Sequence, residues 1–111
     1  MSVDKSVLAK ALDNVHALHN LKVAEFAALE IRIQEFREEH DRCGHLLEDL
    51  RVRQFAGEEV SLEIAQTSHR ANSAIETADA LWKKRTPLMN EIGVARGNVQ
   101  FVENQAKKRP A

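Results

Sequence analysis

The stretch that decides the fold is residues 8–50, LAKALDNVHALHNLKVAEFAALEIRIQEFREEHDRCGHLLEDL. Alternating steps of four and three residues run through it without a break, and no proline interrupts them. Ten of the thirteen positions on this seam are apolar or cysteine. A repeat of this kind is typical of a helix that packs along one stripe against another helix. We therefore predict a first helix over about residues 4–55. The seam consists of Leu8, Leu12, Val15, His19, Lys22, Phe26, Leu29, Ile33, Phe36, His40, Cys43, Leu47 and Leu50.

The first break in this pattern lies at residues 56–60, AGEEV. Gly57 can adopt the left-handed conformation that ends a helix, and the two glutamates that follow suit the start of the next one. We predict the hairpin turn here and a second helix over about residues 61–107. The same stepping continues there through Ile64, Ser68, Ala71, Ile75, Ala78, Trp82, Arg85, Met89, Ile92, Arg96, Val99, Glu103 and Ala106.

Pro87 interrupts the second helix. Proline in a helix interior removes a hydrogen bond, so the chain either kinks there or starts a new helix with Thr86 as its cap and Pro87 in the first turn. The seam continues across Pro87, which favours a kink. The predicted fold is thus all-α, a long antiparallel two-helix coiled-coil hairpin that forms one domain over residues 1–111 and is kinked near Pro87.

Composition narrows the classes of function. Sixteen Lys and Arg against seventeen Asp and Glu give a formal net charge of −1, so no overall field favours nucleic acid or an anionic membrane. Charges interrupt every apolar run, which predicts no membrane insertion. The single cysteine and the lack of a signal-peptide pattern favour a cytoplasmic location.

No motif in the chain indicates catalysis. His40, Cys43, His45 and His69 are zinc-type ligands that a hairpin brings to similar heights, but His45 points away from the seam on which His40 and Cys43 lie, and no CxxC or HExxH spacing is present. Cys43 lies on the seam, where a thiol is neutral and inert. We therefore predict no enzyme activity, no cofactor and no metal. His19, Lys22 and His40 are interpreted as polar seam positions that set the register of the coiled coil or contact a further helix.

Several apolar side chains fall outside the seam of the first helix. Such a surplus usually means that another surface packs there, whether a protein partner or a second copy of the chain. The predicted partner-binding residues are Leu18, Leu21, Ile31 and Leu46, with Val23 beside them.

The charges are distributed unevenly. Residues 25–81 carry six basic and thirteen acidic side chains, whereas residues 82–111 carry seven basic and two acidic ones. A solvated coiled-coil surface accounts for this difference, and docking of one end to a partner is the functional alternative.

A family resemblance rests on strings in both helices. The segments 18–22, LHNLK, and 31–36, IRIQEF, resemble the first helix of FliJ/SctO-type proteins, the stalk subunits of flagellar and type III secretion export ATPases. The second helix, from Ala71-Asn72 through Ala80-Leu81 to Phe101-Val102-Glu103, is similar to that of the family. The resemblance implies a bacterial coiled coil whose hairpin enters the ATPase ring and whose flank contacts the export gate or escorts export chaperones.

Two functions follow as hypotheses. The first is a non-enzymatic interaction protein of the export-stalk kind. The alternative is a stand-alone structural, adaptor or inhibitory helical-bundle protein, for example phage-encoded or homodimeric. The lack of a Gly-rich phosphate loop assigns any nucleotide chemistry to the partner.

Overall fold

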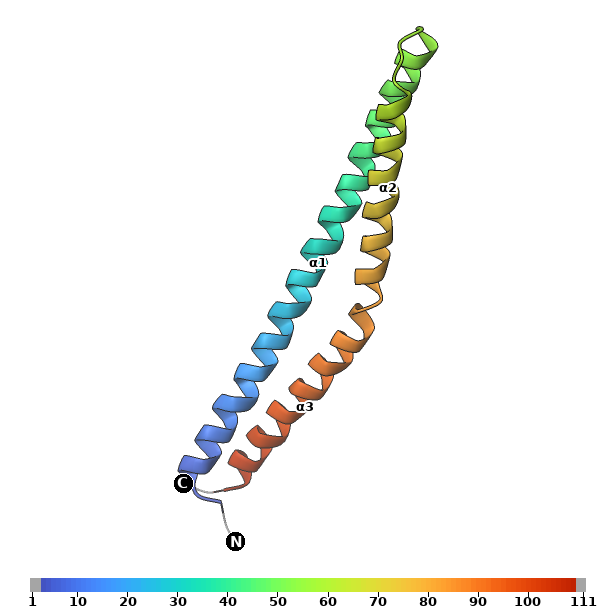
Figure 1. Cartoon of the computed structure of the whole chain (residues 1–111). Coiled ribbons are helices and arrows are strands. Elements are labelled where there is room, and N and C mark those ends of the chain that lie inside the picture. Colours follow the sequence, from blue (N-terminus) through green and yellow to red (C-terminus); the bar gives the residue numbers. More distant parts are fainter. Residues whose placement is uncertain (1–2, 110–111) are drawn as a thin grey trace. The chain divides into compact units, whose positions relative to one another are not determined.

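Residues 3–109 are described by a computed structural model, in which they form three helices (Figure 1). The helices are α1 (Lys5–Phe55), α2 (Ser61–Trp82) and α3 (Arg85–Lys108). No strand occurs between residues 3 and 109. The predicted all-α class is therefore confirmed. None of these helices is long and apolar enough to cross a membrane.

Local hydrogen bonds define where α1 begins. The Asp4 carboxylate accepts a hydrogen bond of 2.9 Å from the backbone N–H of Val7 and one of 2.7 Å from the Ser6 hydroxyl. These bonds satisfy a donor that the helix itself leaves unpaired, as an N-cap residue does. They also lower the pKa of the Asp4 carboxyl, with the Ser6 hydrogen bond as the main cause.

The end of α1 is a Schellman motif. The N–H of Glu58 donates to the carbonyl of Arg53 at 3.1 Å, and the N–H of Gly57 donates to that of Gln54 at 3.0 Å. Gly57 has a φ of 95°, a conformation that side chains with a Cβ rarely adopt. The connection occupies residues 56–60, the same residues that the sequence marks for the turn.

The second predicted helix is divided. Helix α2 ends at Trp82 and α3 begins at Arg85, with Lys83 and Lys84 in a turn between them. The kink predicted near Pro87 is not confirmed, because Pro87 lies in the first turn of α3. A proline at that position removes no hydrogen bond, since the first backbone N–H groups of a helix have no partner within it.

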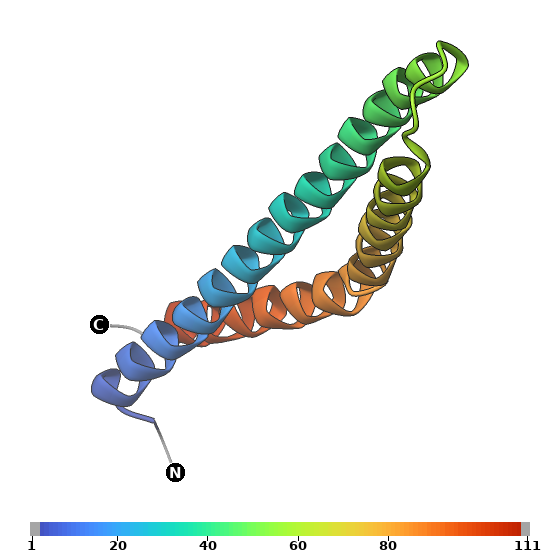
Figure 2. The same cartoon turned by 45° about the horizontal axis from the view of Figure 1, so that its top comes forward.

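The described residues belong to two compact units, and α1 contributes to both. Unit 1 contains residues 3–28 and 85–109, and unit 2 contains Leu29–Lys84. In unit 2, α2 lies beside the second part of α1 in both views (Figures 1 and 2). The guanidinium carbon of Arg37 lies 4.9 Å from the centre of the Trp82 ring, and Arg70 binds Glu39. Higher-numbered residues of α1 thus contact lower-numbered residues of α2.

Unit 1 pairs the first part of α1 with α3. The Nε2 of His16 lies 3.6 Å from a carboxylate oxygen of Glu103, and the Nζ of Lys22 lies 3.3 Å from one of Glu91. The guanidinium carbon of Arg85 lies 5.4 Å from the centre of the Phe26 ring. The residue numbers again run in opposite senses along the two helices.

Burial confirms the seam predicted in α1. All thirteen seam residues are buried or half-buried, and every buried side chain of α1 lies on the seam. Those buried residues are Leu29, Ile33, Cys43 and Leu50.

The predicted seam of the second helix is wrong at every other position. The residues that face inward in α2 and α3 again follow a 4,3 repeat, but the intermediate positions lie one residue earlier than predicted. Ala74, Leu81 and Ala95 are buried, whereas the predicted Trp82, Met89 and Arg96 are exposed. The observed seam is Val60, Ile64, Thr67, Ala71, Ala74, Ala78, Leu81, Arg85, Leu88, Ile92, Ala95, Val99 and Val102, each of which is buried or half-buried.

Candidate protein-binding face

Unit 1 carries a set of large apolar side chains that face solvent. On α1, Leu18 and Leu21 are 45% and 54% exposed, and on α3, Val94 and Phe101 are 66% and 64% exposed. Val7 on α1 is 52% exposed. Large apolar side chains that form a contiguous exposed patch usually mark a surface that another molecule covers. We call Val7, Leu18, Leu21, Val94 and Phe101 the unit 1 face.

Heptad positions place these residues on one flank of the helix pair. With the seam at a and d, Leu18 is a g residue, while Val7, Leu21, Val94 and Phe101 are c residues. In a helix pair that runs in opposite senses, the g and c positions of both helices lie on the same side. The His16–Glu103 ion pair joins two e positions and therefore marks the opposite side.

Two shallow grooves support this assignment, because each is lined by side chains of both helices. The first is lined by Leu18, Lys22, Asn90, Glu91, Val94, Ala95 and Asn98. The second is lined by Val3, Val7, Leu8, Ala11, Phe101, Val102, Gln105 and Arg109. Leu18 and Val94 thus share one groove, and Val7 and Phe101 share the other. The grooves could hold side chains of a partner helix between α1 and α3.

All four residues predicted to bind a partner are exposed, and whether they bind one stays a prediction. Ile31 is 60% exposed and Leu46 is 41% exposed, but both belong to unit 2. Ile31 is an f residue, opposite the seam. Leu46 is a g residue, and charged side chains separate it along this flank of α1 from Leu21. These charged residues are Glu25, Arg32, Glu35, Glu39 and Arg42.

Sequence reasoning missed the part of the face that α3 contributes. Val94 and Phe101 are seven residues apart, which is one heptad, and this spacing is the signal that could have identified them. Met89 and Val23, which are 52% and 43% exposed, are both e residues and lie on the other flank of unit 1.

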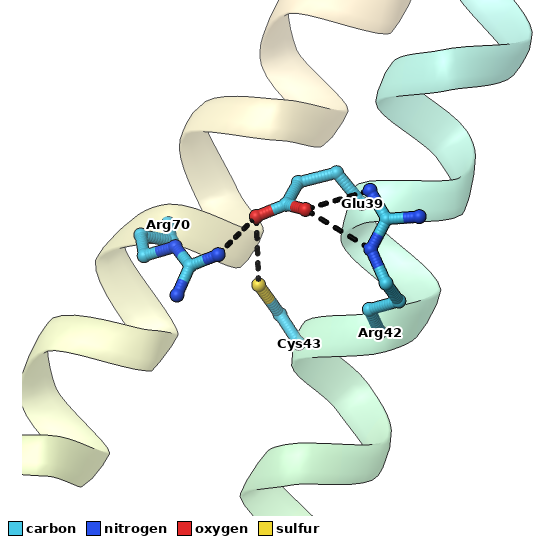
Figure 3. Close-up of polar contacts among 4 residues, drawn as sticks. All are labelled: Glu39, Arg42, Cys43 and Arg70. Atoms are coloured by element: carbon cyan, nitrogen blue, oxygen red, sulfur yellow. Dashed lines mark hydrogen bonds and ion pairs between the residues drawn. The ribbon is translucent and has the colours of Figure 1, made fainter.

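The Glu39 carboxylate of unit 2 accepts hydrogen bonds from three side chains (Figure 3). One oxygen accepts hydrogen bonds of 3.2 and 2.8 Å from Nε and Nη2 of Arg42. The other accepts one from Arg70 on α2 and one of 3.7 Å from the Cys43 thiol. Arg42 and then Arg70 lower the pKa of Glu39. The arrangement is an exposed ion-pair cluster that links α1 to α2 above a buried thiol.

The zinc-type residues do not gather. Cys43 is buried against Glu39, whereas the His45 side chain is 82% exposed and lies 4.0 Å from a carboxylate oxygen of Glu48. His40 lies 3.8 Å from an Asp41 oxygen. Among residues 3–109, no three His, Cys, Asp or Glu side chains are placed to hold a metal ion.

The Cys43 thiol is expected to react slowly in the folded protein. Burial, and secondarily the negative charge of Glu39, raises its pKa above the ordinary value of 9.0, which lowers the fraction of reactive thiolate at pH 8. Labelling with Ellman's reagent should therefore be much slower in buffer than in 8 M urea, where the same thiol is exposed. Equal rates would show that unit 2 opens freely around Cys43.

Comparisons of the chain with protein-family models, with curated proteins and with solved structures find no match.

Proposed function

We propose that this chain is a non-enzymatic helical interaction protein, an antiparallel two-helix coiled-coil hairpin that binds a protein partner through the unit 1 face. The observation that carries the proposal is the exposure of Leu18, Leu21, Val94 and Phe101 on one flank of a helix pair. The centres of protein interfaces are enriched in large apolar side chains and depleted of charge, which matches this flank.

The kind of partner that fits is an amphipathic helix. Two parallel rows of apolar side chains with grooves between them accept a helix whose anchors are spaced by three and four residues. The groove at Leu18 is lined mainly by small, apolar or amide side chains, together with the Lys22–Glu91 ion pair. A charged nucleic acid would find no basic stripe on this flank.

The resemblance to FliJ/SctO-type stalks names the first partner to test. On that proposal the chain acts in the bacterial cytoplasm, its hairpin enters the ring of a flagellar or type III export ATPase, and its flank contacts the export gate or export chaperones. The alternative is a stand-alone structural, adaptor or inhibitory helical-bundle protein, which would bind neither the ring nor the gate.

Partner binding is expected to depend on the unit 1 face and not on apolar exposure in general. The full chain, immobilised, is exposed to a purified export ATPase and, separately, to lysate of the native host. Leu18→Glu should weaken capture by about 30-fold or more, as loss of a central anchor worth at least about 2 kcal/mol does. The matched control is Val52→Glu, because Val52 is also an exposed apolar residue of α1, at 68%, but lies in unit 2.

Three outcomes decide between the hypotheses. ATPase capture by the wild type and Val52→Glu, but not by Leu18→Glu, supports the stalk proposal. Capture of another protein with the same pattern supports the adaptor alternative. If Leu18→Glu captures every partner as well as the wild type does, the unit 1 face is not the binding surface.

A further inference from the structure

The seam of unit 1 is poorly covered by its own two helices. Of the eleven side chains buried among residues 3–109, ten belong to unit 2, and Ala95 alone belongs to unit 1. Leu8, Leu12, Val15 and Phe26, which occupy the seam of α1 in this unit, are only half-buried. Unit 2 is also a pair of helices and buries ten side chains, so the seam of unit 1 is open by comparison. Four helices packed around their a and d positions would enclose such a seam.

Charged residues on this flank, and at the f positions that border its c residues, are confined to its two ends. At positions c, f and g, the central stretches 11–24 of α1 and 94–104 of α3 carry no charged residue. Beyond them lie Lys10 and Lys108 at one end, and Glu25 and Glu91 at the other. Asp4 adds one negative charge at the first end, where the Arg109 guanidinium also lines the groove with Val7 and Phe101, so this end keeps a net positive charge. Lys22 lies 3.5 Å from Glu25 and 3.3 Å from Glu91, which leaves the second end one negative charge in excess.

This distribution is self-complementary. A twofold axis through the uncharged centre of the face would bring the basic end of one copy against the acidic end of the other and would join the two apolar centres. A parallel arrangement would instead place like charges together at both ends. Electrostatic complementarity of this kind fixes the register and orientation of an interface.

We infer that the unit 1 face binds a second copy of this chain, so that α1 and α3 of both copies form a four-helix bundle around a twofold axis. The inference rests on the proposed function and names the partner of the same face. Leu18 and Val94 occupy the centre of the dimer interface, and Lys10 of each copy lies at the end that holds Glu25 of the other. Such an interface is isologous, because the same residues of both copies form it.

The test is sedimentation equilibrium of the full chain over a wide range of concentrations, with circular dichroism of each variant as the check on folding. The wild type and the control Val52→Glu should dimerise with the same dissociation constant. Leu18→Glu should raise that constant by about 30-fold or more, because the twofold axis places two such carboxylates in the apolar centre. Its helicity should stay that of the wild type.

Charge exchange tests the orientation. Lys10→Glu and Glu25→Lys should each raise the dissociation constant by about three- to tenfold, because every ion pair at the rim occurs twice. The double variant K10E/E25K restores opposite charges at both ends and should return the constant toward that of the wild type. Single variants that leave the constant unchanged would overturn the twofold arrangement.

The outcome for the second copy can be separated from that for the proposed function. A wild-type chain that stays monomeric at every concentration overturns the dimer. If that monomer still captures a partner that Leu18→Glu does not, the proposed function stands and the face belongs to another protein. If the wild type neither dimerises nor captures a partner, both fail.

Discussion

Ile33→Ala is expected to lower the free energy of unfolding by about 2 to 5 kcal/mol, the range for deletion of a buried aliphatic side chain. Ile31→Ala, two residues away, should change it by no more than about 0.5 kcal/mol. Both residues are isoleucines of α1, but Ile33 is 2% exposed and Ile31 is 60% exposed. The difference between the variants therefore isolates burial on the α1 seam from helix propensity.

Urea denaturation measures both free energies, with helicity at 222 nm and fluorescence of Trp82 as probes. Trp82 is the single tryptophan of the chain and belongs to unit 2, as do both isoleucines, so its signal reports the unit that the substitutions affect. Equal losses for the two variants would show that α1 does not present the seam inward. A large loss of unfolding free energy for Ile31→Ala alone would show that Ile31, and not Ile33, faces the partner helix.

The seam of α1 could be predicted because its inward positions carry the largest apolar side chains. Leu29, Ile33 and Leu50 differ sharply in hydrophobicity from the charged residues beside them, so one phase of the 4,3 repeat fits and the others do not. The end of α1 could be predicted as well, since Gly57 is the residue type that a Schellman motif requires at its left-handed position.

The phase of the second helix could not be predicted from hydrophobicity. Ile75 is larger than Ala74 and Trp82 is larger than Leu81, while Met89 is about as apolar as Leu88. Hydrophobicity therefore favoured the wrong phase. Buried positions in α2 instead hold Ala71, Ala74 and Ala78. Small side chains on one helix let it approach the large side chains on the other, and a scale of single-residue hydrophobicity does not contain that complementarity.

The candidate site was predicted only in part, on α1 but not on α3. Leu18 and Leu21 stood out because the correct seam of α1 left them outside it. Val94 and Phe101 also lay outside the predicted seam of the second helix, and the signal available for them was their spacing of one heptad. The division of the second helix was one of the two outcomes that Pro87 allowed, but the continuity of the predicted seam favoured the kink. Pro87 instead lies in the first turn of a helix that begins at Arg85.

Ala74→Asp has the largest expected effect on stability among the substitutions that distinguish the observed seam of α2 from the predicted one. Ala74 is 4% exposed, although the predicted seam left it outside. An uncompensated carboxylate at a buried position costs about 3 to 5 kcal/mol, so the variant should be largely unfolded in unit 2 at pH 7. The matched control is Ala80→Asp, which introduces the same residue at an exposed position of the same helix and should cost less than about 1 kcal/mol.

The pH dependence of the stability of Ala74→Asp and Ala80→Asp is a second test of whether Ala74 faces inward. Burial would raise the pKa of Asp at position 74 in the folded chain above the ordinary value of about 3.9, so the destabilisation is greatest above the raised pKa and shrinks as the pH falls toward 3.9. Ala80→Asp should show no such change relative to the wild type. Thermal melts of both variants from pH 7 to pH 4 measure this difference. If Ala74→Asp melts at the wild-type temperature throughout that range, Ala74 faces solvent and the seam of α2 runs through Ile75.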